Sequence, residues 1–71
     1  KGVCFASEIG LSGELRSVPK IDQRINEAEK LGFKALIVSS SAKISISPKK
    51  LKVISFPRIE DVIKILFKEQ G

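Results

Sequence analysis

The sequence predicts a small α/β (α+β) unit with the element order β-β-α-β-β-α. Short apolar runs at 2–11, 35–38 and 52–56 have the length and composition of strands. Apolar residues recur at helical spacing after two of the prolines, Pro19 and Pro57. Because strand-like and helix-like segments alternate along the chain, a layer of helices on a sheet is the expected architecture.

The first predicted element is a hairpin. The segment 2–11, GVCFASEIGL, has the pattern of a buried or half-buried strand. Its large apolar residues share one parity and its small ones the other: Val3, Phe5, Ile9 and Leu11 against Cys4 and Ala6. Ser12 and Gly13 are a turn signal, and the segment 14–18, ELRSV, is typical of a short returning strand.

The next predicted element is an amphipathic helix that begins at Pro19. Proline suits the first helical turn, where its missing N–H costs nothing. The apolar stripe consists of Ile21, Ile25 and Ala28, with Leu31 close to it. Asp22 in the first turn and Lys30 in the last turn both suit the helix dipole. Gly32 is placed to end the helix.

The second half of the chain predicts two further strands and a second helix. The run ALIV at 35–38 is typical of a buried strand, and KVISF at 52–56 of another. Between them, three serines indicate a loop, although the alternating segment 43–47 favours an edge strand. Pro57 opens the last helix. Its predicted buried face is Ile59, Val62, Ile63, Leu66 and Phe67.

Length and cysteine content limit what the chain can be. With 71 residues it is one small domain or part of a larger one. The single cysteine, Cys4, excludes an internal disulfide, and its apolar setting predicts a small buried hydrophobe in a reducing cytosol. There is no histidine and no cysteine cluster, so we expect no metal site. The chain enters a strand-like run at once, as if cut from something longer, with no signal peptide or membrane span.

Charge is distributed unevenly along the chain. The net charge is +5, from 13 basic and 8 acidic residues. The span 30–59 holds seven basic residues and no acid, whereas the rest holds six basic and eight acidic residues. This asymmetry is compatible with a polyanion-binding face, and equally with a surface that serves solubility.

One long stretch, SEIGLSGELRSVPKIDQRINEAEKLGFKALIV, carries a family resemblance. The matching residues are Glu8, Ile9, Gly10, Leu11, Ser12, Gly13, Glu14, Leu15, Arg16 and Val18, then Ile21, Arg24, Ile25, Glu27, Ala28, Leu31, Gly32, Phe33 and Lys34. In this pattern the chain resembles the C-terminal region of the bacterial RadA/Sms DNA repair family. That region in turn resembles the proteolytic domain of Lon protease. The resemblance implies that 1–71 is the C-terminal portion of a Lon-protease-like (ribosomal protein S5 domain 2-like) domain.

The resemblance bears on catalysis through one position. Lon-type domains use a serine nucleophile and a lysine base, and the lysine aligns with Asp22 here. A carboxylate is negatively charged at neutral pH and would oppose a developing oxyanion. Lys20 lies about 200° around the helix from that position, so it points elsewhere. We therefore expect no catalytic residue in this chain, and the Lon-type ATP-dependent serine peptidase is the alternative.

For the parent protein, the resemblance implies a DNA-dependent ATPase of the bacterial cytoplasm. It implies ATP, magnesium and zinc in the parent chain, although no C-x-x-C and no P-loop motif occurs in these residues. It also implies a ring, expected to be a hexamer, that acts in homologous recombination with a recombinase and binds branched or single-stranded DNA. The expected role of the chain is an inactive scaffold for ring assembly and DNA binding, or an oligomerisation module without DNA contact.

The candidate DNA-binding residues are all basic: Arg16, Lys20, Arg24, Lys34, Lys49 and Lys50. Arg16, Lys20 and Arg24 are expected beside the acid-free span, as one continuous basic face. Lys20 and Arg24 lie four residues apart, so they contact phosphate, contact a subunit or remain solvated, with Arg24 then bridging to Glu27. Lysines around 43–52 also suit an edge that resists aggregation. There is no Trp or Tyr, so any contact is to the DNA backbone, without stacking or sequence readout.

Overall fold

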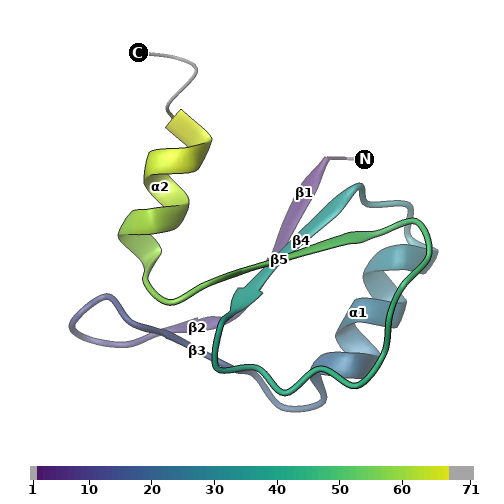
Figure 1. Cartoon of the computed structure of the whole chain (residues 1–71), viewed down its shortest axis with the longest axis horizontal. Helices are drawn as coiled ribbons and strands as arrows, with labels where there is room; N and C mark the ends of the chain where they lie inside the picture. Colours follow the sequence, from purple (N-terminus) through teal and green to yellow (C-terminus); the bar gives the residue numbers. More distant parts are fainter. Residues whose placement is uncertain (1, 68–71) are drawn as a thin grey trace.

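The computed structural model describes residues 2–67 and confirms a small α/β fold with two helices (Figure 1). The elements are, in order, β1 (Val3–Ala6), β2 (Glu8–Ile9), β3 (Leu15–Arg16), α1 (Ile21–Lys30), β4 (Ala35–Ser39), β5 (Lys52–Phe56) and α2 (Ile59–Phe67). In these described residues the strands form a three-stranded sheet, β1-β4-β5, and a separate two-stranded ladder, β2-β3. None of the helices in this range is long and apolar enough to cross a membrane.

The central sheet is parallel, and β4 is its middle strand. The register pairs Phe5 with Ile37 on one side and Ile37 with Ile54 on the other. Every residue of β4 is buried, which confirms the predicted buried strand at 35–38. Because neighbouring residues of a strand face opposite sides, β4 supplies two separate cores.

The larger core lies between the sheet and α1. It consists of Ile21, Ile25 and Ala28 from α1, Leu36 and Val38 from β4, and Leu51 before β5. The predicted stripe of α1 is confirmed at its three main positions, but Leu31 is 59% exposed and lies outside the core. The helix therefore buries a narrow face, and its two flanks remain available for polar contacts.

The start of α1 differs from the prediction. The helix begins at Ile21, so Pro19 lies outside the first turn, and Lys20 is the N-cap residue with φ 56° and ψ 47°. This left-handed conformation is unusual for a residue with a Cβ atom and turns the chain sharply into the helix. At the other end Gly32 has φ 84°, which confirms its predicted role as the helix-ending residue.

The smaller core lies on the opposite face of the sheet. It is formed by Leu15, Ile37 and Val62, with Phe56 and Ile59 packed against it. The predicted buried face of α2 is wrong at three positions, because Ile63, Leu66 and Phe67 are 48%, 47% and 57% exposed. In Figure 1, α2 extends away from the end of β5, so only its first turns reach the sheet.

The predicted single strand at 2–11 is divided into two. Residues before Ser7 pair with β4 as β1, and those after it pair with β3 as β2. Ser7 marks the break, and its Oγ donates to the carbonyl of Arg16 at 2.9 Å. The predicted alternation holds only in β1, and there the larger side chains are the exposed ones. Val3, Phe5, Ile9 and Leu11 are 52%, 42%, 53% and 109% exposed, so none of them lies in a core.

The segment 40–51 is not a strand. It runs from the end of β4 past α1 to the start of β5, without a pairing partner (Figure 1). The edge strand predicted at 43–47 is therefore wrong, although the alternation behind it is present. Ala42, Ile44 and Ile46 pack against the larger core while the residues between them are exposed. An extended chain lying on a helix gives the same alternation as a strand on a sheet.

Candidate nucleic-acid interface

The two flanks of α1 carry different polar groups. Asp22 and Glu29 lie seven residues apart, which is close to two helical turns, so they share one flank. That flank faces the segment 40–51, because both carboxylates accept hydrogen bonds from it. Arg24 and Glu27 lie on the other flank, beside β1, where they line a groove together with Cys4 and other apolar residues. The sequence-predicted basic residues are therefore distributed around α1 rather than over one face.

Asp22 makes a local structural contact. Its Oδ1 accepts the backbone N–H of Ser45 at 3.1 Å, and its Oδ2 accepts the Ser45 hydroxyl. The resemblance to Lon-type domains implies a lysine base at this position. In this chain the side chain there ties a loop to the first turn of α1.

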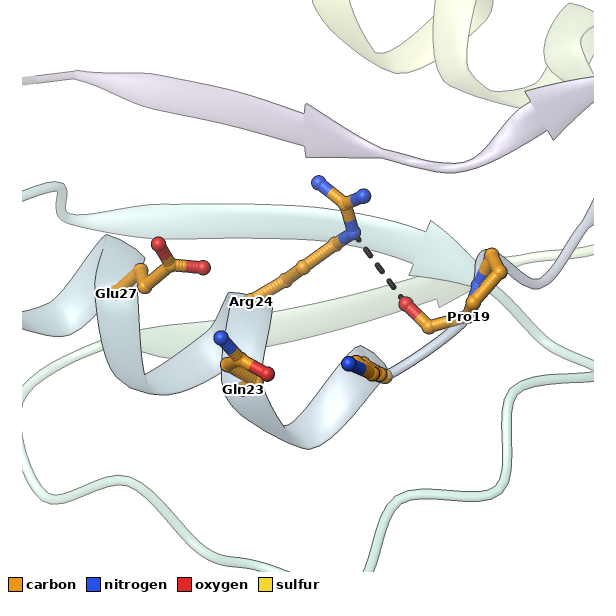
Figure 2. Close-up of a pocket in the computed structure, with 5 residues that line it drawn as sticks. Pro19, Gln23, Arg24 and Glu27 are labelled. Atoms are coloured by element: carbon orange, nitrogen blue, oxygen red, sulfur yellow. Dashed lines mark hydrogen bonds between the residues drawn. The ribbon is translucent and has the colours of Figure 1, made fainter.

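Lys20 and Arg24 lie at the N-terminal end of α1, and both are exposed. Arg24 extends back over the helix start, where its Nε donates to the carbonyl of Pro19 at 3.4 Å (Figure 2). Arg24 does not form the expected ion pair with Glu27, although both side chains line the same shallow groove. The two cations keep most of their hydrogen-bonding capacity for a further partner.

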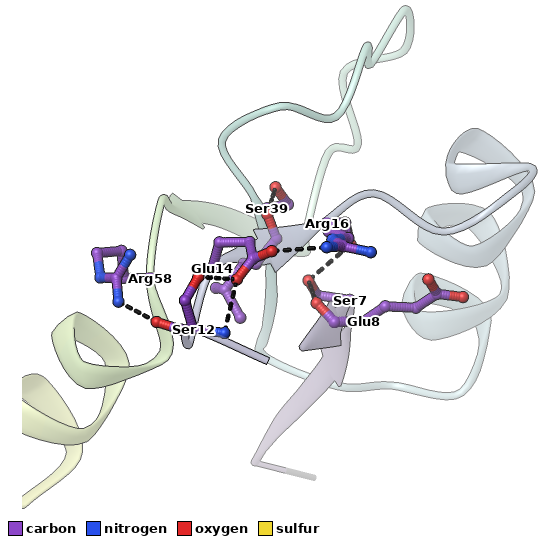
Figure 3. Close-up of polar contacts among 8 residues, drawn as sticks. Ser7, Glu8, Ser12, Glu14, Arg16, Ser39 and Arg58 are labelled. Carbon is purple, nitrogen blue, oxygen red and sulfur yellow. Dashed lines mark hydrogen bonds and ion pairs between the residues drawn. The ribbon is translucent and has the colours of Figure 1, made fainter. Parts of the chain in front are cut away.

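Arg16 already has an anionic partner in the hairpin. Its Nη2 lies 2.7 Å from Oε2 of Glu14 (Figure 3). A hydrogen bond from Ser12, and to a smaller extent one from Arg16, lowers the pKa of Glu14 from 4.5 to about 2. The Glu14 carboxylate therefore offsets the charge of Arg16, which makes Arg16 the least suited of the six candidates to bind phosphate.

The remaining three candidates, Lys34, Lys49 and Lys50, lie at the opposite end of α1. Lys30 and Lys52 lie beside them, and we define the lysine cluster as Lys30, Lys34, Lys49, Lys50 and Lys52. The backbone places them together: Lys30 ends α1, the N–H of Lys52 donates to the carbonyl of Lys34 at 3.0 Å, and the N–H of Lys50 donates to Glu29 at 2.7 Å. All five are exposed, and none forms an ion pair with another residue of the described range 2–67.

The six candidate residues thus do not form one continuous face, because Lys20 and Arg24 lie at one end of α1 and Lys34, Lys49 and Lys50 at the other, while Arg16 lies in the hairpin. Lys20 and Lys30 are ten residues apart on α1, which separates their backbones by about 15 Å along the helix axis. The acidic residue Glu29 lies beside the lysine cluster, and its carboxylate accepts hydrogen bonds from the backbone N–H groups of Lys50 and Leu51. These two hydrogen bonds lower the pKa of Glu29, so it remains ionised.

Two sets of polar contacts were not predicted from the sequence: those of Asp22 and Glu29 with the segment 40–51, and that of Arg58 with Ser12. The seven-residue spacing of Asp22 and Glu29 was a visible signal for a shared helix flank. Arg58 gave no such signal, because it donates to the carbonyl of Ser12, 46 residues away. This contact fastens the hairpin tip to the start of α2 (Figure 3). Arg58 also forms an ion pair with Glu60.

Cys4 contributes no recognisable chemistry. It is half-buried rather than fully buried, and its thiol lies 3.7 Å from the carbonyl of Ala35. Burial raises the pKa of this thiol, which disfavours the reactive thiolate. Within residues 2–67, no group of three His, Cys, Asp or Glu side chains is arranged to hold a metal ion.

Comparison with known proteins finds relatives in sequence over most of the chain. No protein-family model matches the chain. DNA repair protein RadA of Streptococcus pneumoniae is 46% identical over 65 residues, which is 90% of this chain and 16% of that protein. DNA repair protein RadA of Bacillus subtilis and that of Listeria monocytogenes are each 39% identical over 62 residues, 86% of this chain and 14% of theirs. The chain thus spans about one sixth or one seventh of these relatives, and it is homologous to that part of the bacterial DNA repair protein RadA.

Proposed function

We propose that the chain is the C-terminal portion of a catalytically inactive Lon-like domain in a DNA repair ATPase. In that protein it contributes to ring assembly and binds the DNA backbone without sequence preference. The observation that carries the DNA contact is the lysine cluster, five exposed ammonium groups at one end of α1 without an ion-pair partner among the described residues. ATP hydrolysis, with its magnesium, and any zinc site would belong to other parts of the longer protein.

The chemistry of the lysine cluster suits phosphate. Lysine ammonium groups bind phosphates as point charges, and each contact releases counterions from DNA. The chain has no Trp or Tyr to stack on bases. Phosphate contacts orient a protein on DNA but do not distinguish sequences. This supports contact with the DNA backbone without sequence preference. Branched or single-stranded DNA as the target, and a recombinase as a partner, rest on the relation to RadA alone.

The test compares two pairs of basic residues in the full-length protein. Changing Lys49 and Lys50 to alanine should weaken binding to a labelled oligo(dT) strand and flatten its salt dependence by about one unit of log–log slope per lost contact, or somewhat less on a single strand. Changing Lys20 and Arg24 to alanine tests the second group in the same way. Lys64→Ala is the control for loss of a single positive charge, taken from α2 on the opposite face of the sheet.

Three results would decide between the candidate functions. Weaker binding by the Lys49 and Lys50 variant, equal for different base sequences, supports the DNA contact. Unchanged affinity and salt slope in both double variants, with the ring intact, would favour an oligomerisation module without DNA contact. A broken ring in the Lys20 and Arg24 variant would assign that pair to a subunit interface.

The same proposal excludes peptidase activity. Because Asp22 binds Ser45 and no lysine occupies its position, the full-length protein should not cleave unfolded protein substrates. Sustained cleavage that disappears on Asp22→Ala would contradict this and support the Lon-type peptidase.

A further inference from the structure

The basic segment 40–51 is held to α1 at two points by carboxylates. At the N-terminal point, Asp22 accepts the N–H of Ser45 at 3.1 Å and also the Ser45 hydroxyl. At the C-terminal point, Glu29 accepts the N–H groups of Lys50 and Leu51 at 2.7 and 3.2 Å. The segment has no strand partner, so these bonds replace the ladder that would otherwise fix its backbone.

The position of the second contact matters for the lysine cluster. Glu29 binds the backbone of Lys50 itself and of the residue after it, directly before β5. Leu51 is 4% exposed, so its side chain is packed while the two lysines before it are exposed. Glu29 therefore fixes the backbone at the point from which the side chains of Lys49 and Lys50 extend into solvent.

We propose that Glu29 is a positioning residue for polyanion binding. Asp22 and Glu29 together fix the segment 40–51 on α1, and Glu29 thereby holds Lys49 and Lys50 beside the other members of the lysine cluster. This inference rests on the proposed DNA contact, and it gives an acidic residue a role in that contact. The pKa of Glu29, lowered by the N–H groups that it accepts, keeps this contact in place at neutral pH.

For the change in polyanion affinity caused by Glu29→Gln, the inference predicts the opposite sign to simple electrostatics. Removing a negative charge from a basic surface raises its affinity for a polyanion when nothing else changes. If Glu29 positions Lys50, Glu29→Gln instead weakens binding, because an amide oxygen is a weaker acceptor for two N–H donors than a carboxylate. Glu27→Gln is the matched control, since Glu27 lies on the same helix, is exposed, and lies on the flank away from the segment 40–51.

The experiment measures binding of a labelled oligo(dT) strand to the full-length protein. The proteins compared are the wild type, Lys50→Ala, Glu29→Gln, Glu27→Gln and the Lys49 and Lys50 alanine variant with and without Glu29→Gln. We expect Glu29→Gln to reduce affinity by roughly the factor that Lys50→Ala produces and to flatten the salt slope by about one unit. In the alanine background Glu29→Gln should cause no further loss of affinity, because the loss passes through those lysines and only the gain from removing a negative charge remains. Amide hydrogen exchange should become faster at Lys50 and Leu51.

Each outcome separates the inference from the function on which it rests. Unchanged or higher affinity in Glu29→Gln, with weaker binding by the alanine variant, would overturn the positioning role and leave the DNA contact standing. An equal loss in both backgrounds would also overturn it, since the effect would not depend on the lysines. Unchanged binding by the alanine variant would overturn the DNA contact and this inference together.

Discussion

Ile25 is the residue on which the larger core depends most. Its side chain is 0% exposed and lies among Ile21, Ala28, Leu36 and Val38. Truncating a fully buried isoleucine to alanine costs roughly 2–5 kcal/mol, from lost burial and the cavity left behind. A domain of this size is stable by only about 4–11 kcal/mol, at roughly 0.05–0.15 kcal/mol per residue. Ile25→Ala should therefore remove a large part of the free energy of unfolding, whereas Ile25→Val should lower it by about 0.5–1.5 kcal/mol.

Urea unfolding followed by circular dichroism measures both changes at low protein concentration. Ile65→Ala is the control, because Ile65 is 58% exposed on α2 and its truncation should stay within about 0.5 kcal/mol of the wild type. The unfolding midpoint should fall with little change in the denaturant slope. A loss in Ile25→Ala no larger than that in Ile65→Ala would refute the assignment of α1 to the core.

Two further predictions concern the hairpin and the sheet edge. The pKa of Glu14 is lowered from 4.5 to about 2, so its ionised carboxylate stabilises the hairpin above pH 4.5 and this stabilisation is lost as the pH falls from about 4.5 towards 2. The amide chemical shift of Ser12 should titrate over this range in the wild type and not in Glu14→Gln. Strand β1 is an outer strand of the sheet with Val3 and Phe5 52% and 42% exposed, so the isolated chain should self-associate and Phe5→Lys should lower its sedimentation mass, whereas a clean monomer of the wild type at high concentration would argue against this.

Local sequence signals determined most of the elements. Helix α1 and its buried positions follow from the spacing of Ile21, Ile25 and Ala28, and β4 follows from a continuous apolar run. The end of α1 follows from Gly32, because a positive φ favours glycine. These signals work because each is read within one turn or one strand. Many of the residues that carry the resemblance to RadA lie in α1 and at its end.

The tertiary structure decided what local patterns leave open. Alternation at 42–46 is the same for a chain lying on a sheet or on a helix, and only the hydrogen bonds from the segment to α1 distinguish the two. The outward direction of Val3 and Phe5 depends on which face of β1 meets the core. Likewise, the separation of the candidate basic residues follows from the path of the chain around α1. Sequence spacing gives charge and periodicity, but position in space depends on contacts between residues far apart in the chain, such as Arg58 with Ser12.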